Sequence, residues 1–232
     1  MSRAGRRRRP RGVAAEQPVV LVFGEDENDT KAIRELIVAL CPELESRIET
    51  RRRPLVLIKD ARPEDVPDRA RQIADVVAAE RRRRNVLCVF AHQDCDDVEP
   101  SHEAIGRKIE DALERAGCHV HAVTPAWEIE TWWFLWPAAV RAYQSSWKLP
   151  TRYFGADVGL IVNAKEELRR AVLAPGDRRP RRYRESDSPL LAKKVREMGI
   201  VRNPEAKSLS YERFVGSVDA CCSRVSSATA AR

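Results

Sequence analysis

The stretch PVVLVFGEDENDT, residues 18–30, contains the change of pattern that decides the fold. Its first half, residues 18–24, is a short apolar run that is rich in valine and ends in glycine, which is typical of a β-strand buried on both faces. Its second half offers several N-cap side chains. Apolar residues then recur with helical spacing from Ile33 to Leu40, and Pro42 would end the helix. A buried strand that leads directly into an amphipathic helix is the repeating unit of an α/β fold.

The same alternation continues through residue 136. Further apolar runs predict strands at residues 54–58, 85–91 and 119–124, and helical spacing predicts helices at residues 67–84, 101–117 and 126–136. Because the connections are short and helices separate the strands, we expect an α/β fold. It would have a mostly parallel sheet of about four strands with helices on both faces.

The pattern changes after residue 150. Helical spacing predicts helices at residues 163–173 and 189–199 and around 211–218, and residues 174–186 predict a loop. We therefore expect four parts along the chain. They are a disordered basic arm (1–17), an α/β domain (18–160), a helical basic appendage (161–222) and a disordered tail (223–232).

The composition excludes several classes of protein. Of the 232 residues, 43% are hydrophobic and 33% are charged, which suits a globular chain rather than a disordered one. No run approaches the roughly 18 apolar residues that cross a bilayer, so we expect no membrane span. The basic N-terminus has no apolar segment and does not resemble a secretory signal. Six cysteines without a CxxC pair indicate reduced thiols in a cytoplasmic protein.

The net charge of +7 is unevenly distributed along the chain. Residues 1–12 carry six arginines and no acid, residues 13–164 carry 20 basic and 26 acidic side chains, and residues 165–202 carry 12 basic and six acidic ones. A basic arm and a basic C-terminal stretch suit a polyanion such as nucleic acid. The acidic body would repel that partner unless its carboxylates surround cations. The alternative is an ordinary, solvated, arginine-rich surface.

Acidic side chains follow the predicted strands at the points where the strands end. Glu25 and Asp29 follow the first strand, Asp94 and Asp96 follow the third, and Glu130 follows the fourth. In open α/β sheets, ligands bind beyond the carboxyl ends of the strands, and carboxylates that meet there repel one another unless a cation bridges them. Oxygen ligands suit Mg²⁺ or Mn²⁺, and two such ions support cleavage of phosphodiester bonds. The alternative is that the acids after the first strand only cap a helix.

Three segments around these acids resemble a known family. VLVFGEDEND (20–29), VFAHQDCDD (89–97) and WEIETWWFL (127–135) are similar to segments of stand-alone bacterial Toprim-like proteins, which are related to the OLD (overcoming lysogenization defect) nucleases. The resemblance covers roughly residues 18–140 and implies a Toprim-like α/β fold. It also implies a partner ATPase of the SMC/ABC type and a role in phage defence or DNA repair.

The resemblance assigns roles position by position. The ligands of two Mg²⁺ or Mn²⁺ ions would be Glu25, Asp29, Asp94, Asp96 and Glu130. Catalysis would fall to Glu25, Asp94 and Asp96. Nucleases of this kind also use a lysine near the scissile phosphate, and we expect Lys193 in that role, with Lys194 as the other candidate. The order of Gly24 and Glu25 is the reverse of the family's usual Glu-Gly. The function implied is a Mg²⁺- or Mn²⁺-dependent endonuclease that cleaves DNA or RNA.

Two other functions remain open. A receiver-like signalling module also gathers acids around Mg²⁺, although Asp94 lies farther along the chain than a receiver's phospho-acceptor and no lysine ends a fifth strand. A degenerate Toprim protein would bind nucleic acid or hold an ATPase through its Trp-rich helix. Isolated side chains are weaker evidence for a function than the acidic motifs. His92 could orient a carboxylate, Trp132 could stack on a base, and His119 with His121 has a spacing that zinc can use. Core or structural roles are more common for such residues.

Overall fold

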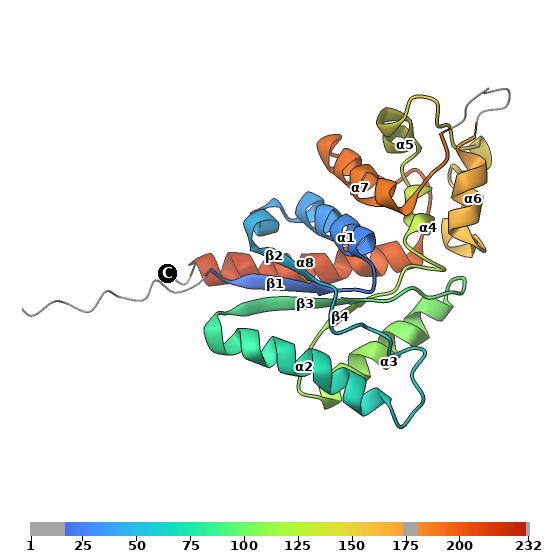
Figure 1. Ribbon diagram of the computed structural model, residues 1–232. Helices are drawn as coiled ribbons and strands as arrows, with labels where there is room; N and C mark the ends of the chain where they lie inside the picture. Colours follow the sequence, from blue (N-terminus) through green and yellow to red (C-terminus); the bar gives the residue numbers. More distant parts are fainter. Residues whose placement is uncertain (1–16, 174–180, 231–232) are drawn as a thin grey trace, which may run out of the picture.

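The computed structural model describes residues 17–173 and 181–230 and contains a four-stranded, all-parallel sheet (Figure 1). The strands are β1 (Val19–Phe23), β2 (Ile48–Arg51), β3 (Val86–His92) and β4 (His121–Val123), in the order β2-β1-β3-β4. The predicted α/β fold, with a parallel sheet and helices on both of its faces, is confirmed. The expected basic arm at residues 1–17 falls, except for residue 17, outside the described residues.

Helices form a layer on each face of the sheet. One layer contains α1 (Glu27–Leu40), α7 (Ser188–Glu197) and α8 (Leu209–Ala230), and the other contains α2 (Val66–Arg83) and α3 (Ser101–Arg115) (Figure 1). The shorter helices are α4 (Glu130–Trp133), α5 (Pro137–Tyr143) and α6 (Ala164–Ala171). Short 3-10 turns lie at Pro42–Arg47, Thr151–Tyr153, Val158–Leu160 and Glu185–Asp187. Within the described ranges, no helix is both long and apolar enough to cross a bilayer.

The side chains of β1 alternate between two hydrophobic cores. Val20 and Val22 pack with α1, whereas Leu21 and Phe23 pack with α2, and all four are fully buried. Complete burial of such side chains contributes about 1.5–3 kcal/mol each. Phe214 of α8 belongs to the same core as α1, as does Leu191 of α7. The C-terminal helices therefore share a core with the sheet.

The second strand is not where the apolar pattern indicated. We expected it at residues 54–58, but β2 is Ile48–Arg51, with Ile48 opposite Val20 of β1. β2 is an edge strand with a single buried residue, so its sequence carries no apolar run. In the segment 54–58, Val56 and Ile58 are buried in the core under α2 without joining the sheet. Their apolar character reflects burial and not strand pairing.

The expected helix over residues 126–136 is also wrong in extent. Only Glu130–Trp133 form α4, and Trp127, inside the expected helix, has a left-handed backbone conformation with φ of 57°. Trp132, Trp133 and Trp136 are each at most 1% exposed. Their indole N–H groups donate to Ser210 Oγ, Ser188 Oγ and the Ile200 carbonyl, respectively. These three rings form part of the core and are not available to stack on bases or to hold an ATPase.

The C-terminal helix differs from expectation in two ways. Cys222 is paired with Cys41 and Cys221 with Cys88, so the expectation of reduced thiols is wrong for these four cysteines. The partners lie 181 and 133 residues apart, which explains why sequence spacing gave no sign of them. The disulfides fasten α8 to the end of α1 and to β3. α8 also extends to Ala230, so residues 223–230 are helical, where we expected a disordered tail.

Glu99 joins the loop that follows β3 to the start of α8. Its carboxylate is 5% exposed and accepts hydrogen bonds from Ser208 Oγ (2.7 Å), Leu209 N (2.7 Å) and Ser210 N (2.8 Å). The two backbone donors belong to the first turn of α8, where the helix dipole favours an anion. Gly159 packs so closely against this carboxylate that a Cβ on it would lie 2.0 Å from the carboxyl carbon. One buried carboxylate thus fixes three segments relative to one another.

We predict that Glu99→Gln lowers the free energy of unfolding by about 2–3 kcal/mol, because an amide nitrogen cannot accept these hydrogen bonds. Urea denaturation measures the loss. The matched control is Glu103→Gln, an exposed residue on α3 whose change should alter stability by less than about 0.5 kcal/mol. Equal losses in the two variants would contradict the role of Glu99.

Candidate metal centre

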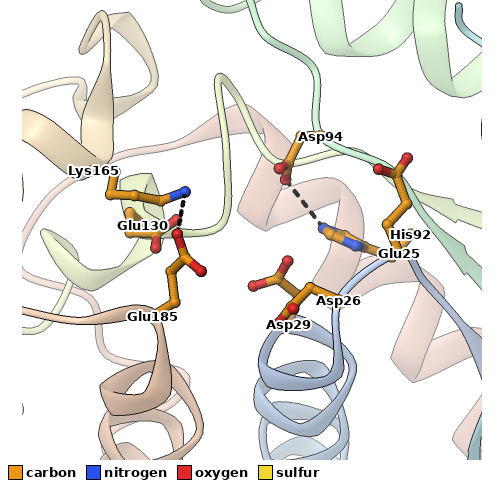
Figure 2. A pocket seen from close by; sticks show the side chains of 8 residues that line it. All are labelled: Glu25, Asp26, Asp29, His92, Asp94, Glu130, Lys165 and Glu185. Carbon is orange, nitrogen blue, oxygen red and sulfur yellow. Dashed lines mark ion pairs between the residues drawn. The ribbon is translucent and has the colours of Figure 1, made fainter. Parts of the chain in front are cut away.

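A small acidic cavity lies where the strand order reverses. The chain leaves β1 toward β2 on one side of it, and β3 leads to β4 on the other, so a crevice opens between the carboxyl ends of β1 and β3. The cavity there has a volume of about 160 Å³. Its lining consists of six carboxylates, one histidine and one lysine: Glu25, Asp26, Asp29, Glu130, Glu185, Asp94, His92 and Lys165 (Figure 2).

The connection from β1 to α1 supplies the first group of acids. Asp26 is the N-cap of α1 and accepts a hydrogen bond from Asn28 N at 2.6 Å. Capping thus explains Asp26 but leaves Glu25 and Asp29 to face the cavity. A Cβ on Gly24 would lie 2.6 Å from Thr30 Cγ2 and 3.3 Å from His92 Nδ1. Glycine before Glu25 is therefore a steric requirement of the turn, which brings this connection close to the end of β3.

The end of β3 supplies a histidine and an aspartate. His92, the last residue of β3, is 1% exposed, and its Nε2 lies 3.4 Å from Asp94 Oδ1. Across the part of the chain that the structure describes, neither nitrogen of His92 has a hydrogen-bond partner, nor does the buried Asp94 Oδ1. One ligand atom each from Asp29, His92 and Asp94 lie within 4.8 Å of one another. His92 and Asp94 thus have buried atoms without a hydrogen-bond partner, and with Asp29 they form a group of ligand atoms that a single cation could satisfy.

The opposite wall comes from residues far along the chain. Glu130 begins α4, is 2% exposed, and accepts a hydrogen bond from Tyr183 Oη at 2.9 Å. Lys165, on α6, lies between two carboxylates, with Nζ 3.0 Å from Glu128 and 3.1 Å from Glu185. Figure 2 shows the Lys165–Glu185 pair across the cavity from the Asp94–His92 pair. One wall of the cavity therefore carries acidic side chains and His92, and the opposite wall carries acidic side chains together with the ammonium group of Lys165.

Four of the predicted site residues meet in this cavity, and two do not. Glu25, Asp29, Asp94 and Glu130 all line it. Asp96 has a left-handed backbone (φ 53°) and its carboxylate pairs with Lys59, outside the lining of the cavity. Lys193 lies on an exposed face of α7, where its Nζ is 3.9 Å from Glu197, and Lys194 also pairs with Glu197 at 2.5 Å. Lys59 also donates to the Asp94 carbonyl, so Asp96 lies beside the cavity without lining it, whereas the contact of Lys193 lies on α7 away from the site.

Sequence reasoning missed three residues of the site. Lys165 occupies the place expected for Lys193, and Glu185 and Tyr183 complete the wall around it. Nothing in the local pattern singles them out, because the site forms only when the C-terminal segments pack against the sheet. His92 did carry a signal, since a histidine two residues before Asp94 at a strand end is well placed to face the same ligand.

Burial and mutual repulsion make the acids of the cavity weak. Burial, with a contribution from Asp94, raises the pKa of Asp29 from 3.8 to about 6, and burial together with Glu128 raises the pKa of Glu130 from 4.5 to about 8. The pKa of Glu25 is raised in the same way. Burial lowers the pKa of His92, but the neighbouring carboxylates, led by Asp94, outweigh it and the net shift is upward. Without a cation, the carboxyl groups of Asp29 and Glu130 therefore stay protonated to a higher pH than they would in water.

A comparison with known proteins found no match: no family model, no curated protein and no solved structure matches the chain.

The raised pKa values give a prediction about pH and metal. Folded Asp29 and Glu130 bind protons more tightly than they do in the unfolded chain, so stability is highest below their ordinary pKa values and falls as pH rises through about 6 and about 8. For Asp29 the shift corresponds to about 3 kcal/mol at most. We predict that Mn²⁺ raises the melting temperature by several degrees at pH 8 and by much less at pH 5.

The variant Asp29→Asn tests this assignment in thermal unfolding with and without Mn²⁺. It should remove most of the response to Mn²⁺, whereas Asp111→Asn, an exposed change on α3, should keep it. A response that is the same at both pH values, or that survives in Asp29→Asn, would contradict the site.

Proposed function

We propose that the protein is a Toprim-type nuclease that uses Mg²⁺ or Mn²⁺ to cleave phosphodiester bonds in DNA or RNA. One observation carries the proposal. Carboxylates from three strand-to-helix connections converge on one cavity: Glu25 and Asp29 follow β1, Asp94 follows β3, and Glu130 follows β4. Beside them lies the buried His92, which has no hydrogen-bond partner among the described residues. The resemblance of the same three segments to Toprim-like proteins supports the reaction class.

The donor set fits a divalent cation. Asp29, His92 and Asp94 have facing donor atoms for one ion, and the other two predicted ligands, Glu25 and Glu130, lie in opposite walls of the same cavity. Carboxylates suit Mg²⁺ and Mn²⁺, and an imidazole among them is better accepted by Mn²⁺. Bound there, such ions would activate a water molecule and neutralise the charge that develops on the phosphate.

The protein's own side chains have separate tasks in this proposal. Lys165 is held in place by Glu128 and Glu185 and presents an ammonium group to the phosphate oxygens, in place of Lys193. Tyr183 fixes the Glu130 carboxylate. Glu25 lines the cavity, and desolvation there raises its pKa above the ordinary value, so in this proposal it would accept and return a proton.

The proposal includes two partners, a nucleic-acid substrate and an ATPase. The cation-rich C-terminal stretch suits nucleic acid as the substrate. An SMC/ABC-type ATPase and a role in phage defence or DNA repair follow from the Toprim resemblance. The buried Trp residues of α4 do not provide the contact with that ATPase, so another surface must.

A receiver-like phosphoacceptor is the second candidate, because the order β2-β1-β3-β4 is also that of the first four strands of receiver-type folds. In that function Asp94 would take a phosphoryl group. Over the described ranges, however, the sheet has no fifth strand to carry the lysine of a receiver.

We predict that purified protein nicks plasmid DNA or cuts RNA in the presence of Mn²⁺ or Mg²⁺. Asp94→Asn removes charge at the centre of the site and should reduce the cleavage rate by at least about 100-fold while the protein stays folded. Agarose gels with time courses measure the rate, and Asp111→Asn is the isosteric control that should cleave normally.

The same proteins separate the two candidate functions. Wild type and Asp94→Asn that behave alike in each metal, with both DNA and RNA, would refute the nuclease. Incorporation of phosphate from acetyl phosphate in wild type but not in Asp94→Asn, without cleavage, would establish the receiver instead.

We also predict that Lys165→Met slows cleavage more than Lys193→Met does, by about 10-fold or more, because only Lys165 lines the cavity. The readout is the cleavage rate at saturating Mn²⁺, alongside Mn²⁺ affinity. Equal cleavage rates for the two variants would contradict a role of Lys165 in cleavage and leave it a purely structural one.

A further inference from the structure

A groove lined by arginines lies beside the acidic cavity. Its volume is about 670 Å³, and its lining is Arg169, Arg181, Arg182, Tyr183 and Arg184. Tyr183 connects the two hollows, because its hydroxyl donates to Glu130 in the cavity wall at 2.9 Å. Two residues further on, Glu185 lines the cavity itself. The segment 181–185 thus runs from the basic groove to the acidic cavity.

Tyr183 is the one buried side chain of the segment 181–185. Tyr183 is 1% exposed, whereas Arg182 and Arg184 on either side of it are exposed. Arg181 is held by Asp187 at 2.6 Å and by the Tyr143 hydroxyl at 2.9 Å. Neither Arg182 nor Arg184 forms an ion pair with a carboxylate of residues 17–173 or 181–230. Their charge is therefore uncompensated and directed toward solvent next to the site.

The groove offers charge but no surface for stacking. Its one aromatic side chain, Tyr183, is buried with its hydroxyl directed at Glu130. Exposed guanidinium groups without an exposed ring are suited to the phosphates of a nucleic acid rather than to its bases. Such contacts position a strand without reading its sequence.

The neighbouring cavity limits what can enter. It is small and has walls on both sides, from α1 and the loop after β3 on one and from α4, α6 and Glu185 on the other. A single extended strand can bring a phosphate into such a space, whereas the phosphates of a regular duplex stay on the outside of a wide cylinder.

We propose that Arg182 and Arg184 hold the phosphates of a single nucleic-acid strand and direct it into the acidic cavity. The proposal rests on the nuclease function and deepens it by naming the substrate as unpaired strand. DNA and RNA share the phosphate chemistry, so the groove serves both.

The test is the binding of fluorescent single-stranded DNA and RNA oligonucleotides to the full-length protein, measured by anisotropy in EDTA over a series of salt concentrations. Arg182→Gln/Arg184→Gln should weaken the binding of both strands about 10-fold or more near 0.1 M salt. It should also lower the slope of log affinity against log salt by about 1.4, or about 0.7 for each phosphate that the variant no longer neutralises.

The matched control is Arg81→Gln/Arg82→Gln, which removes the same charge from exposed positions at the end of α2, near the start of β3. It should change affinity by less than about 2-fold, because distant charges are screened. Equal losses in the two double variants would overturn the proposal, as would an equal effect of the groove variant on blunt duplex of the same sequence.

Failure of this inference can be told from failure of the nuclease function. Binding in EDTA involves no cleavage, so a protein that cuts nucleic acid but binds it independently of Arg182 and Arg184 refutes only the groove. A protein that binds single strands through the groove but cuts nothing with Mn²⁺ or Mg²⁺ refutes only the nuclease.

Discussion

The mutual repulsion of carboxylates at the carboxyl ends of β1 and β3 is the constraint around which this molecule is arranged. Glu25, Asp29, Asp94 and Glu130 line a cavity of about 160 Å³ that Lys165 compensates only in part. Burial raises the pKa values of Asp29 and Glu130, and repulsion from Asp94 and Glu128, respectively, adds to the shift. Protons relieve this repulsion at low pH. In the proposed function a divalent cation would relieve it at neutral pH, and one ligand atom each of Asp29, His92 and Asp94 lies within 4.8 Å of the others.

The rest of the fold holds these groups together against that repulsion. β1 is buried on both faces, so the connection that carries Glu25 and Asp29 begins from a fixed strand. Glu99 binds the loop after β3 to the first turn of α8, and the disulfides of Cys221 and Cys222 fasten the same helix to β3 and α1. Tyr183 and Lys165 then complete the wall from C-terminal segments. The site is therefore shared between the parallel sheet and the helices that follow it.

Sequence reasoning predicted the parts that depend on local pattern. The alternation of apolar runs and helical spacing was sufficient for the α/β fold, and acids at strand ends identified Glu25, Asp29, Asp94 and Glu130. It failed where the outcome depends on long-range packing. β2 carries charged residues because it is an edge strand, and Val56 and Ile58 are apolar because a core covers them. Asp96 follows the same strand as Asp94, but its left-handed backbone turns it toward Lys59. Lys165 lines the cavity and Lys193 does not, because of helix packing that no local motif records.

The most direct test of this account is diffraction from crystals soaked in Mn²⁺, with data collected at the manganese absorption edge. We predict an anomalous peak among Asp29, His92 and Asp94, with ligand atoms about 2.0–2.3 Å from it, and loss of that peak in Asp94→Asn crystals. Crystals at pH 8 with saturating Mn²⁺ that show no anomalous density in the cavity between β1 and β3 would contradict the central claim.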